Sequence, residues 1–273
     1  MIERNVKRLL FFGAHPDDCD LLCGGTAIQW AAAGHRVKFV SVTSGDTGHQ
    51  TLSRKETAAV RAKEAAASGK TAGIEYEVLD HPCGLEASVA IRYELLRIIR
   101  KFGPDVVISH RLYDYHPDHR ATAQLVMDTA YIVMVPHYCE DTPVPEINPI
   151  YAYCRDRFVD PRPFRPDAAV AIDSVVEKKL DMLNCHASQF YEWLPWIEGF
   201  KDFDAGKMTE TQRREWLKRW LERCRISESG PDREALIGAY GESGKSAVFA
   251  ETFEQSPYSR HLPLDEFRTF MLP

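Results

Sequence analysis

The sequence lacks the features of several large classes of protein. Its 273 residues contain no apolar run close to the ~18 residues that cross a membrane. The short apolar run after the basic N-terminal residues ends in His-Pro-Asp-Asp and not in a small-residue cleavage site. The net charge of −6 argues against the basic patch of a nucleic-acid-binding protein. We therefore expect no signal peptide, no membrane segment and no nucleic-acid partner.

The cysteines do not form a disulfide pattern. Their number, 7, is odd, they are scattered, and no C-x-x-C spacing occurs. This usage is typical of reduced thiols, so we predict a cytoplasmic protein. Cys19 and Cys23 lie near the first motif discussed below and could ligate a metal, but small buried hydrophobic residues are the favoured interpretation.

Strand-like and helical segments alternate through the first half of the chain. The predicted strands are residues 9–14, 37–43, 75–79 and 106–109, and the predicted helices are residues 24–33, 54–68, 89–102 and 119–133. Strands that alternate with helices of this length indicate βαβ units, whose crossovers are right-handed. We therefore predict an α/β fold with a doubly wound, mostly parallel sheet.

The second half is richer in proline and aromatic residues. Its prolines between Val135 and Asp167 predict loops and edge strands around residues 150–158. A strand at 168–172, a helix at 174–188 and an amphipathic helix at 209–225 follow. We expect one domain over residues 1–273, with a core of about 7–190 and a C-terminal helical and loop elaboration of about 191–273.

Two clusters of histidine and aspartate stand at the ends of apolar strands. They are His15-Pro16-Asp17-Asp18 and His116-Pro117-Asp118-His119. The carboxyl ends of parallel strands open into one crevice, so we expect the clusters to meet there. Either motif alone is typical of a turn or a helix start. Two such motifs at strand ends of one sheet indicate a metal site.

Two histidines and one carboxylate, with a fourth position for water, form the ligand pattern of a catalytic zinc ion. Zinc lowers the pKa of bound water to about 7. Hydrolysis also requires a proton acceptor beside the water and a donor for the developing oxyanion. Asp17 and His116, the unassigned members of the two clusters, suit these roles. His110, at the end of the second strand, is a candidate neighbour of the ligands.

The motifs together resemble those of the LmbE-like, or PIG-L, zinc N-deacetylases. The matching segments are Ala14 to Asp18, Gly24-Gly25-Thr26, Thr43 to Gly48, Arg61-x-x-Glu64 and Asp114-x-His116-Pro117-Asp118-His119, with weaker matches at His186-x-Ser188-Gln189 and Ala250 to Phe253. The chain departs from the family pattern at Cys19, where an acidic residue is usual, and at His49, where some members have a carboxylate.

The resemblance implies a Rossmann-like fold, one zinc ion per chain and a role for each motif. His15, Asp18 and His119 would be the metal ligands. Asp17 would be the general base and then the acid that protonates the leaving amine. His116 would stabilise the tetrahedral oxyanion, with Asp118 keeping it charged. Arg61, Asp46 and His49 are assigned to substrate binding, and a homo-oligomer, trimer or hexamer, would fit the family.

We therefore predict a zinc-dependent hydrolase that deacetylates an N-acetylglucosamine-type substrate, a small acetylamino sugar or conjugate. One alternative is a metal-dependent phosphoesterase, which usually needs two metal ions about 3.5–4 Å apart. Asp17 and Asp46 are the spare carboxylates for such a site. Another alternative is a non-catalytic ligand-binding protein on the same scaffold, against which the intact Asp17 and His116 argue.

Overall fold

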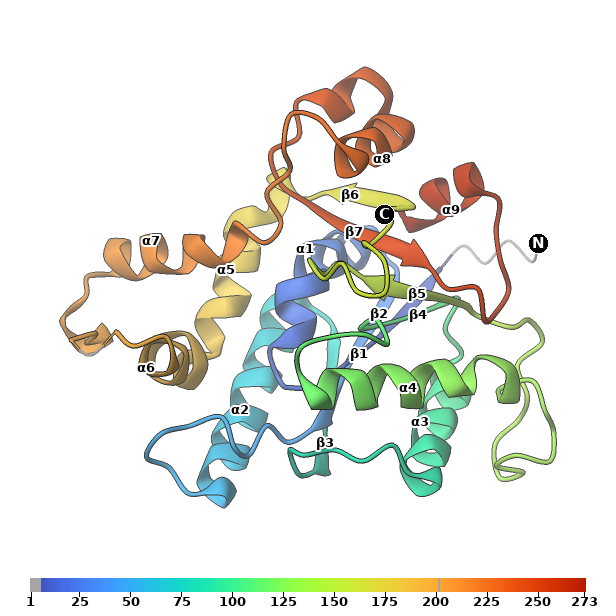
Figure 1. Ribbon diagram of the computed structural model, residues 1–273, viewed down its shortest axis with the longest axis horizontal. Helices are drawn as coiled ribbons and strands as arrows, with labels where there is room; N and C mark the ends of the chain where they lie inside the picture. Colours follow the sequence, from blue (N-terminus) through green and yellow to red (C-terminus); the bar gives the residue numbers. More distant parts are fainter. Residues whose placement is uncertain (1–5, 201) are drawn as a thin grey trace.

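The computed structural model describes residues 6–200 and 202–273. Seven strands form one sheet in the order β3-β2-β1-β4-β5-β7-β6 (Figure 1). The strands are β1 (Arg8–Gly13), β2 (Arg36–Thr43), β3 (Glu75–His81), β4 (Val106–Ser109), β5 (Ile150–Cys154), β6 (Ala168–Ala171) and β7 (Ala250–Gln255).

The strand directions confirm the predicted mostly parallel sheet. β3, β2, β1, β4 and β5 run parallel, while β7 pairs antiparallel with both β5 and β6. The chain moves outward from β1 to β3 and then returns to place β4 on the other side of β1. The carboxyl ends of β1 and β4 therefore form the topological switch point, where open α/β sheets bind their ligands.

Helices cover both faces of the sheet. Alternate residues of β1 point to opposite faces, with Leu9 and Phe11 in one buried cluster and Leu10 and Phe12 in the other. The first face carries α1 (Asp18–Ala32), α2 (Arg54–Ala72), α5 (Val176–Cys185) and α9 (Leu264–Met271). The second face carries α3 (Val89–Phe102) and α4 (Pro117–Ile132).

The remaining helices lie beside this core. α7 (Glu210–Leu221) and α6 (Leu194–Ile197) project next to α5 in Figure 1, and α8 (Pro231–Tyr240) packs on β6. Leu217 and Trp220 of α7 pack against Leu180 and Leu183 of α5, as expected for an amphipathic helix. Short helical turns occupy residues 173–175, 189–193, 205–207 and 241–245. Within the described ranges, no helix is long and apolar enough to cross a membrane.

Some elements differ from the sequence prediction. β5 lies between β4 and β7 and not at an edge, and all of its residues are buried. β7, from the segment assigned to the C-terminal elaboration, is an interior strand of the sheet. α7 ends before the predicted residue 225 because Cys224 and Ile226 pair with the chain at residues 248–250. α1 begins at Asp18 and not near Gly24, so Asp18 lies at a helix N-terminus.

Candidate metal centre and active site

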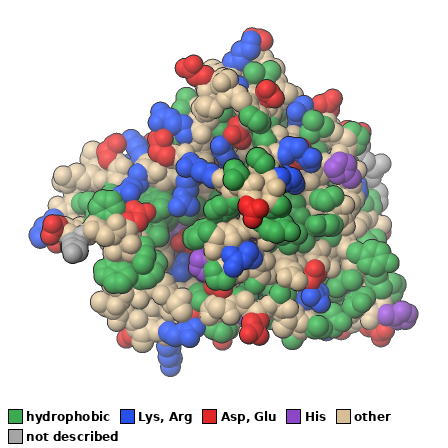
Figure 2. All heavy atoms as spheres, viewed as in Figure 1, with side chains coloured by type: hydrophobic (Ala, Val, Ile, Leu, Met, Phe, Trp, Pro, Cys, Tyr) green, Lys and Arg blue, Asp and Glu red, His purple; other side chains and the backbone are tan. Residues whose placement is uncertain are grey.

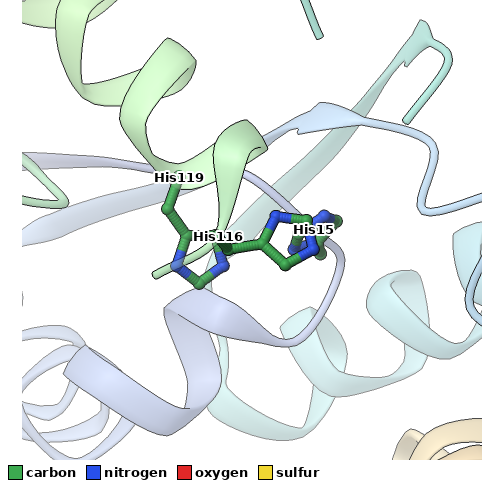
Figure 3. Close-up of side chains that lie close together, drawn as sticks. All are labelled: His15, His116 and His119. Carbon is green, nitrogen blue, oxygen red and sulfur yellow. The ribbon is translucent and has the colours of Figure 1, made fainter. Parts of the chain in front are cut away.

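The two His/Asp motifs meet at the switch point. His15 lies in the loop after β1, and His116 and His119 lie at the start of α4, which follows β4 (Figure 3). The His15 ring centre lies 4.6 Å from that of His116 and 5.3 Å from that of His119. Pro117 at the first helical position lets α4 begin here, with His116 as its N-cap. The predicted meeting of the motifs is therefore observed.

The Asp18 carboxylate lies at the centre of this cluster. Its oxygens are 3.4 Å from Nδ1 of His15, Nε2 of His110 and Nε2 of His119. The His15 backbone N–H donates to Asp18 Oδ2 at 2.7 Å, which closes the turn between them. Burial alone would raise the pKa of Asp18, but the neighbouring histidines hold it well below its usual value. A charged oxygen donor thus stands among imidazole nitrogens.

A second carboxylate stands behind each of the two predicted histidine ligands. Nε2 of His15 is 3.2 Å from Asp118 Oδ2, and Nδ1 of His119 is 3.1 Å from Asp114 Oδ1. Each ring therefore presents one nitrogen to Asp18 and the other to a carboxylate. Metal-ligating histidines show this arrangement because the outer carboxylate fixes the tautomer and the ring orientation. Histidine and carboxylate donors fit zinc. Among the described residues, the groups whose donor atoms all lie within 4.8 Å of one another are His15/His116/His119, His15/Cys83/Asp118 and Asp18/His110/His119.

The structure places Asp118 differently from its predicted role. Its carboxylate faces His15 and accepts the backbone N–H groups of Gly84 and Leu85 at 3.0 and 2.8 Å. Towards His116 it presents only its backbone N–H, which donates to Nδ1 at 3.1 Å. Burial, together with the charges of His15 and His119, lowers the pKa of His116 to about 4. A neutral His116 imidazole with its proton on Nε2 is therefore favoured, although the charge of Asp118 opposes the lowering of this pKa.

Asp17 and Arg61 form a buried pair beside the cluster. Arg61 is 3% exposed, and its Nη2 donates to Asp17 Oδ1 at 2.9 Å. Nη1 of Arg61 donates to the Gly45 carbonyl at 3.0 Å. Gly45 has φ +67°, and a Cβ there would overlap the guanidinium group, so the turn requires glycine. Arg61, predicted as a substrate contact, thus holds the predicted general base.

These groups open into one cavity of about 510 Å³, a size suited to a small molecule. His15, Asp17, Asp18, Arg61, His116 and His119 all line it. The lining also includes residues that the sequence left unassigned or in doubt, among them Cys83, His110, Tyr115, Phe158, Gln189, Trp193 and Trp220. Cys83 follows β3, so a third strand end at the same sheet edge was the signal that could have found it.

Two predicted substrate contacts do not line the cavity. Asp46 accepts a hydrogen bond from Arg54 at 2.7 Å and from the Cys83 backbone N–H at 2.9 Å. Nε2 of His49 lies 2.9 Å from Glu192, and its Nδ1 accepts the backbone N–H groups of residues 51 and 52. Both side chains stabilise the loop that follows β2, and neither belongs to the cavity wall.

A His/Asp donor set with a further carboxylate in the same cavity, at the switch point of a Rossmann-like sheet, is typical of metal-dependent hydrolases. Residues 10–130 match the family model described as "PIG-L: GlcNAc-PI de-N-acetylase". The matched segment contains both His/Asp motifs, so the resemblance to the PIG-L (LmbE-like) family predicted from the motifs is confirmed over these residues.

Named relatives include two different activities. Diacetylchitobiose deacetylase of Thermococcus kodakarensis is 28% identical over 205 residues, which cover 71% of this chain and 76% of the relative. 4-Oxalmesaconate hydratase of Pseudomonas putida is 25% identical over 206 residues, which cover 70% and 79%. The structure of N,N'-diacetylchitobiose deacetylase from Pyrococcus horikoshii superposes with a TM-score of 0.67 at 24% identity, covering 92% of this chain and 84% of that one. This last similarity concerns the fold.

Proposed function

We propose that the protein is a zinc-dependent hydrolase that removes the acetyl group from an N-acetylglucosamine-type amine. The observation that carries the proposal is the Asp18 carboxylate between His15 and His119, with a further carboxylate behind each ring. The family description and the deacetylase among the relatives support the choice of reaction.

The metal ligands and the general base have separate tasks. A zinc ion held by His15, Asp18 and His119 would activate water and polarise the amide carbonyl. Asp17 lines the same cavity, and it would accept the proton of the attacking water and return it to the leaving amine. Arg61 binds Oδ1 of Asp17, so we assign proton transfer to Oδ2.

His116 would stabilise the oxyanion as a neutral donor. Its Nδ1 accepts the Asp118 backbone N–H, which leaves the proton on Nε2. A preorganised N–H of this kind, in a partly buried site, stabilises the negative charge that develops on the carbonyl oxygen. No charged imidazole is required for this step.

The test is free-amine and acetate release from N-acetylglucosamine and its oligomers by zinc-loaded protein. We expect Asp17→Ala to lower kcat about 10²–10⁴-fold and His116→Ala to lower it about 10²–10³-fold. His137→Ala is the matched control, since the His137 side chain is 91% exposed. Near-wild-type rates in both site variants, with the metal retained, would rule out these roles.

A second candidate is hydration of a carbon–carbon double bond, which the hydratase among the relatives supports. Activated water and a neighbouring carboxylate can also serve an addition reaction. The two reactions differ in their products. Deacetylation splits the substrate into acetate and an amine, whereas hydration adds water to the double bond and gives a single product. Loss of the ultraviolet absorbance of an unsaturated polycarboxylate, without amine release from any acetylamino sugar, would favour the hydratase.

A further inference from the structure

Arginines from two separate segments enter the cavity wall in addition to Arg61 and Arg111. Arg155 and Arg157 follow β5, and Arg223 follows α7. Nη2 of Arg157 donates to the backbone carbonyl of Glu222 at 2.9 Å, which brings the segments together next to Arg223. Figure 2 shows Lys and Arg side chains gathering on this face, between the α7 side and the centre of the molecule.

The carboxylates of the cavity do not neutralise these arginines. Asp17 pairs with Arg61, Asp156 with Arg111, and Glu251 with Lys179, while Asp18 and Asp114 face histidines. Arg155 pairs with Asp232, which lies outside the lining. In the part of the chain that the structure describes, no carboxylate oxygen lies within 4.0 Å of Arg157 or Arg223. Among the described residues, Arg157 and Arg223 are therefore the two cavity arginines without a carboxylate partner.

The same segment shows that this lack of partners is local. Arg214, Arg219 and Arg225 each form an ion pair with a glutamate or an aspartate. These three do not line the cavity, whereas Arg223 does. A surface that pairs these outward arginines and leaves Arg157 and Arg223 of the cavity without a carboxylate partner is suited to an incoming anion.

The guanidinium groups line the same cavity as the candidate metal centre. The Arg223 guanidinium lies 5.2 Å from the ring centre of Trp220, a contact that restricts its orientation. Arg223 and Tyr115 line the same cavity. The Tyr115 ring in turn lies 5.7 Å from the rings of His116 and His119. One small substrate can therefore reach both groups.

We propose that Arg157 and Arg223 form an anion-binding subsite, so that the substrate is an acetylamino compound whose other end carries a carboxylate or a phosphate. Planar guanidinium groups bind both anions through paired hydrogen bonds. The reaction rests on the proposed deacetylase function, whereas the anion rests only on the arginines.

The test compares three glycosides of N-acetylglucosamine that differ in one group: the neutral methyl glycoside, the carboxymethyl glycoside and the 1-phosphate. We expect kcat/KM to be at least about tenfold higher for an anionic compound than for the neutral one, through KM, with the advantage declining as salt increases. The anionic glycoside with the larger increase in kcat/KM shows whether the subsite prefers a carboxylate or a phosphate. Arg157→Gln/Arg223→Gln should reduce the anionic-to-neutral ratio to about one, and the matched control Arg225→Gln should preserve it.

Separate outcomes overturn the subsite and the proposed function. If the wild type hydrolyses all three glycosides equally, or the double variant keeps the ratio, the subsite is wrong and the deacetylase stands. If none is hydrolysed, the deacetylase is wrong, and calorimetric binding of N-acetylglucosamine 1-phosphate to zinc-loaded protein decides the subsite. The subsite is supported if the double variant, but not the control variant, binds N-acetylglucosamine 1-phosphate about tenfold more weakly than the wild type. Equal affinities overturn it, because zinc itself binds phosphate in every variant.

Discussion

The Asp118 carboxylate contacts a predicted metal ligand that lies far away in sequence. Its Oδ2 lies 3.2 Å from Nε2 of His15, which is 103 residues away in sequence. We predict that Asp118→Asn weakens zinc binding about 10–100-fold, because outer carboxylates orient ligating imidazoles and increase their basicity. Competition with a chromogenic chelator measures this affinity. Asp141→Asn, at an exposed site, is the control. Unchanged zinc affinity with a reduced kcat would instead support the role implied by the family resemblance, in which Asp118 acts on His116.

Arg61 provides a second test at the scale of one residue. A substrate contact would act mainly on KM, whereas a residue that positions Asp17 acts on kcat. Because Arg61 is buried and bound to Asp17 and Gly45, we predict that Arg61→Gln lowers kcat at least about tenfold with little change in KM. Steady-state kinetics, with circular dichroism to confirm folding, measures both. A rise in KM alone would support the role predicted from the family resemblance.

At the scale of elements, one buried ion pair joins α1, α5 and β7. Glu251 of β7 accepts the backbone N–H groups of Gly25 and Thr26 at 2.8 and 2.7 Å and the Lys179 ammonium at 2.6 Å. Lys179 also donates to the Leu21 carbonyl at 2.8 Å. A Cβ on Gly25 would lie 2.6 Å from Ile172 Cγ2, so only glycine permits this approach of α1. The Gly-Gly-Thr and Ala-Glu-Thr-Phe motifs are thus two sides of one contact.

Removing one partner of this pair should destabilise the fold strongly. We predict that Glu251→Ala reduces the free energy of unfolding by about 3–5 kcal/mol, because Lys179 is then buried without a counter-charge. Urea denaturation measures the change. The double variant Glu251→Leu/Lys179→Leu should be more stable than Glu251→Ala, since no charge is then left unpaired. A loss below about 1 kcal/mol in Glu251→Ala would contradict the structural role of the pair.

The same strand shows where prediction from sequence reaches its limit. β1, β2 and β4 were predictable because each is a continuous apolar run, as buried parallel strands are. β7 contains Glu251, Thr252, Glu254 and Gln255, and it is nevertheless fully buried. The partners that make this burial tolerable, such as Arg162 on Glu254, lie far away in sequence. The residues of the two His/Asp motifs were predictable because each motif is a short continuous segment. The contacts of Asp118 with His15 and of Arg61 with Asp17 were not predictable, because these partners lie far apart in sequence.

For the whole molecule, the candidate metal centre links the two halves of the sheet. Its predicted ligands come from the loop after β1 and from the start of α4, on both sides of the switch point. An ion that binds only the folded chain stabilises it by about 2.7 kcal/mol at 100 times its dissociation constant. We therefore predict that a chelator abolishes activity and lowers Tm, and that zinc restores both.

The stoichiometry and the variants make this prediction specific. Metal analysis should give one equivalent per chain, and His119→Ala should remove the rise of Tm with zinc while the exposed His137→Ala keeps it. Two equivalents would favour the phosphoesterase, whose reaction uses a pair of ions. Asp46, one of the carboxylates considered for a second ion, is bound to Arg54 and to the Cys83 backbone, so the structure offers that ion few free ligands there. A Tm that does not respond to zinc would contradict the proposed metal centre, and therefore also the proposed zinc-dependent hydrolase.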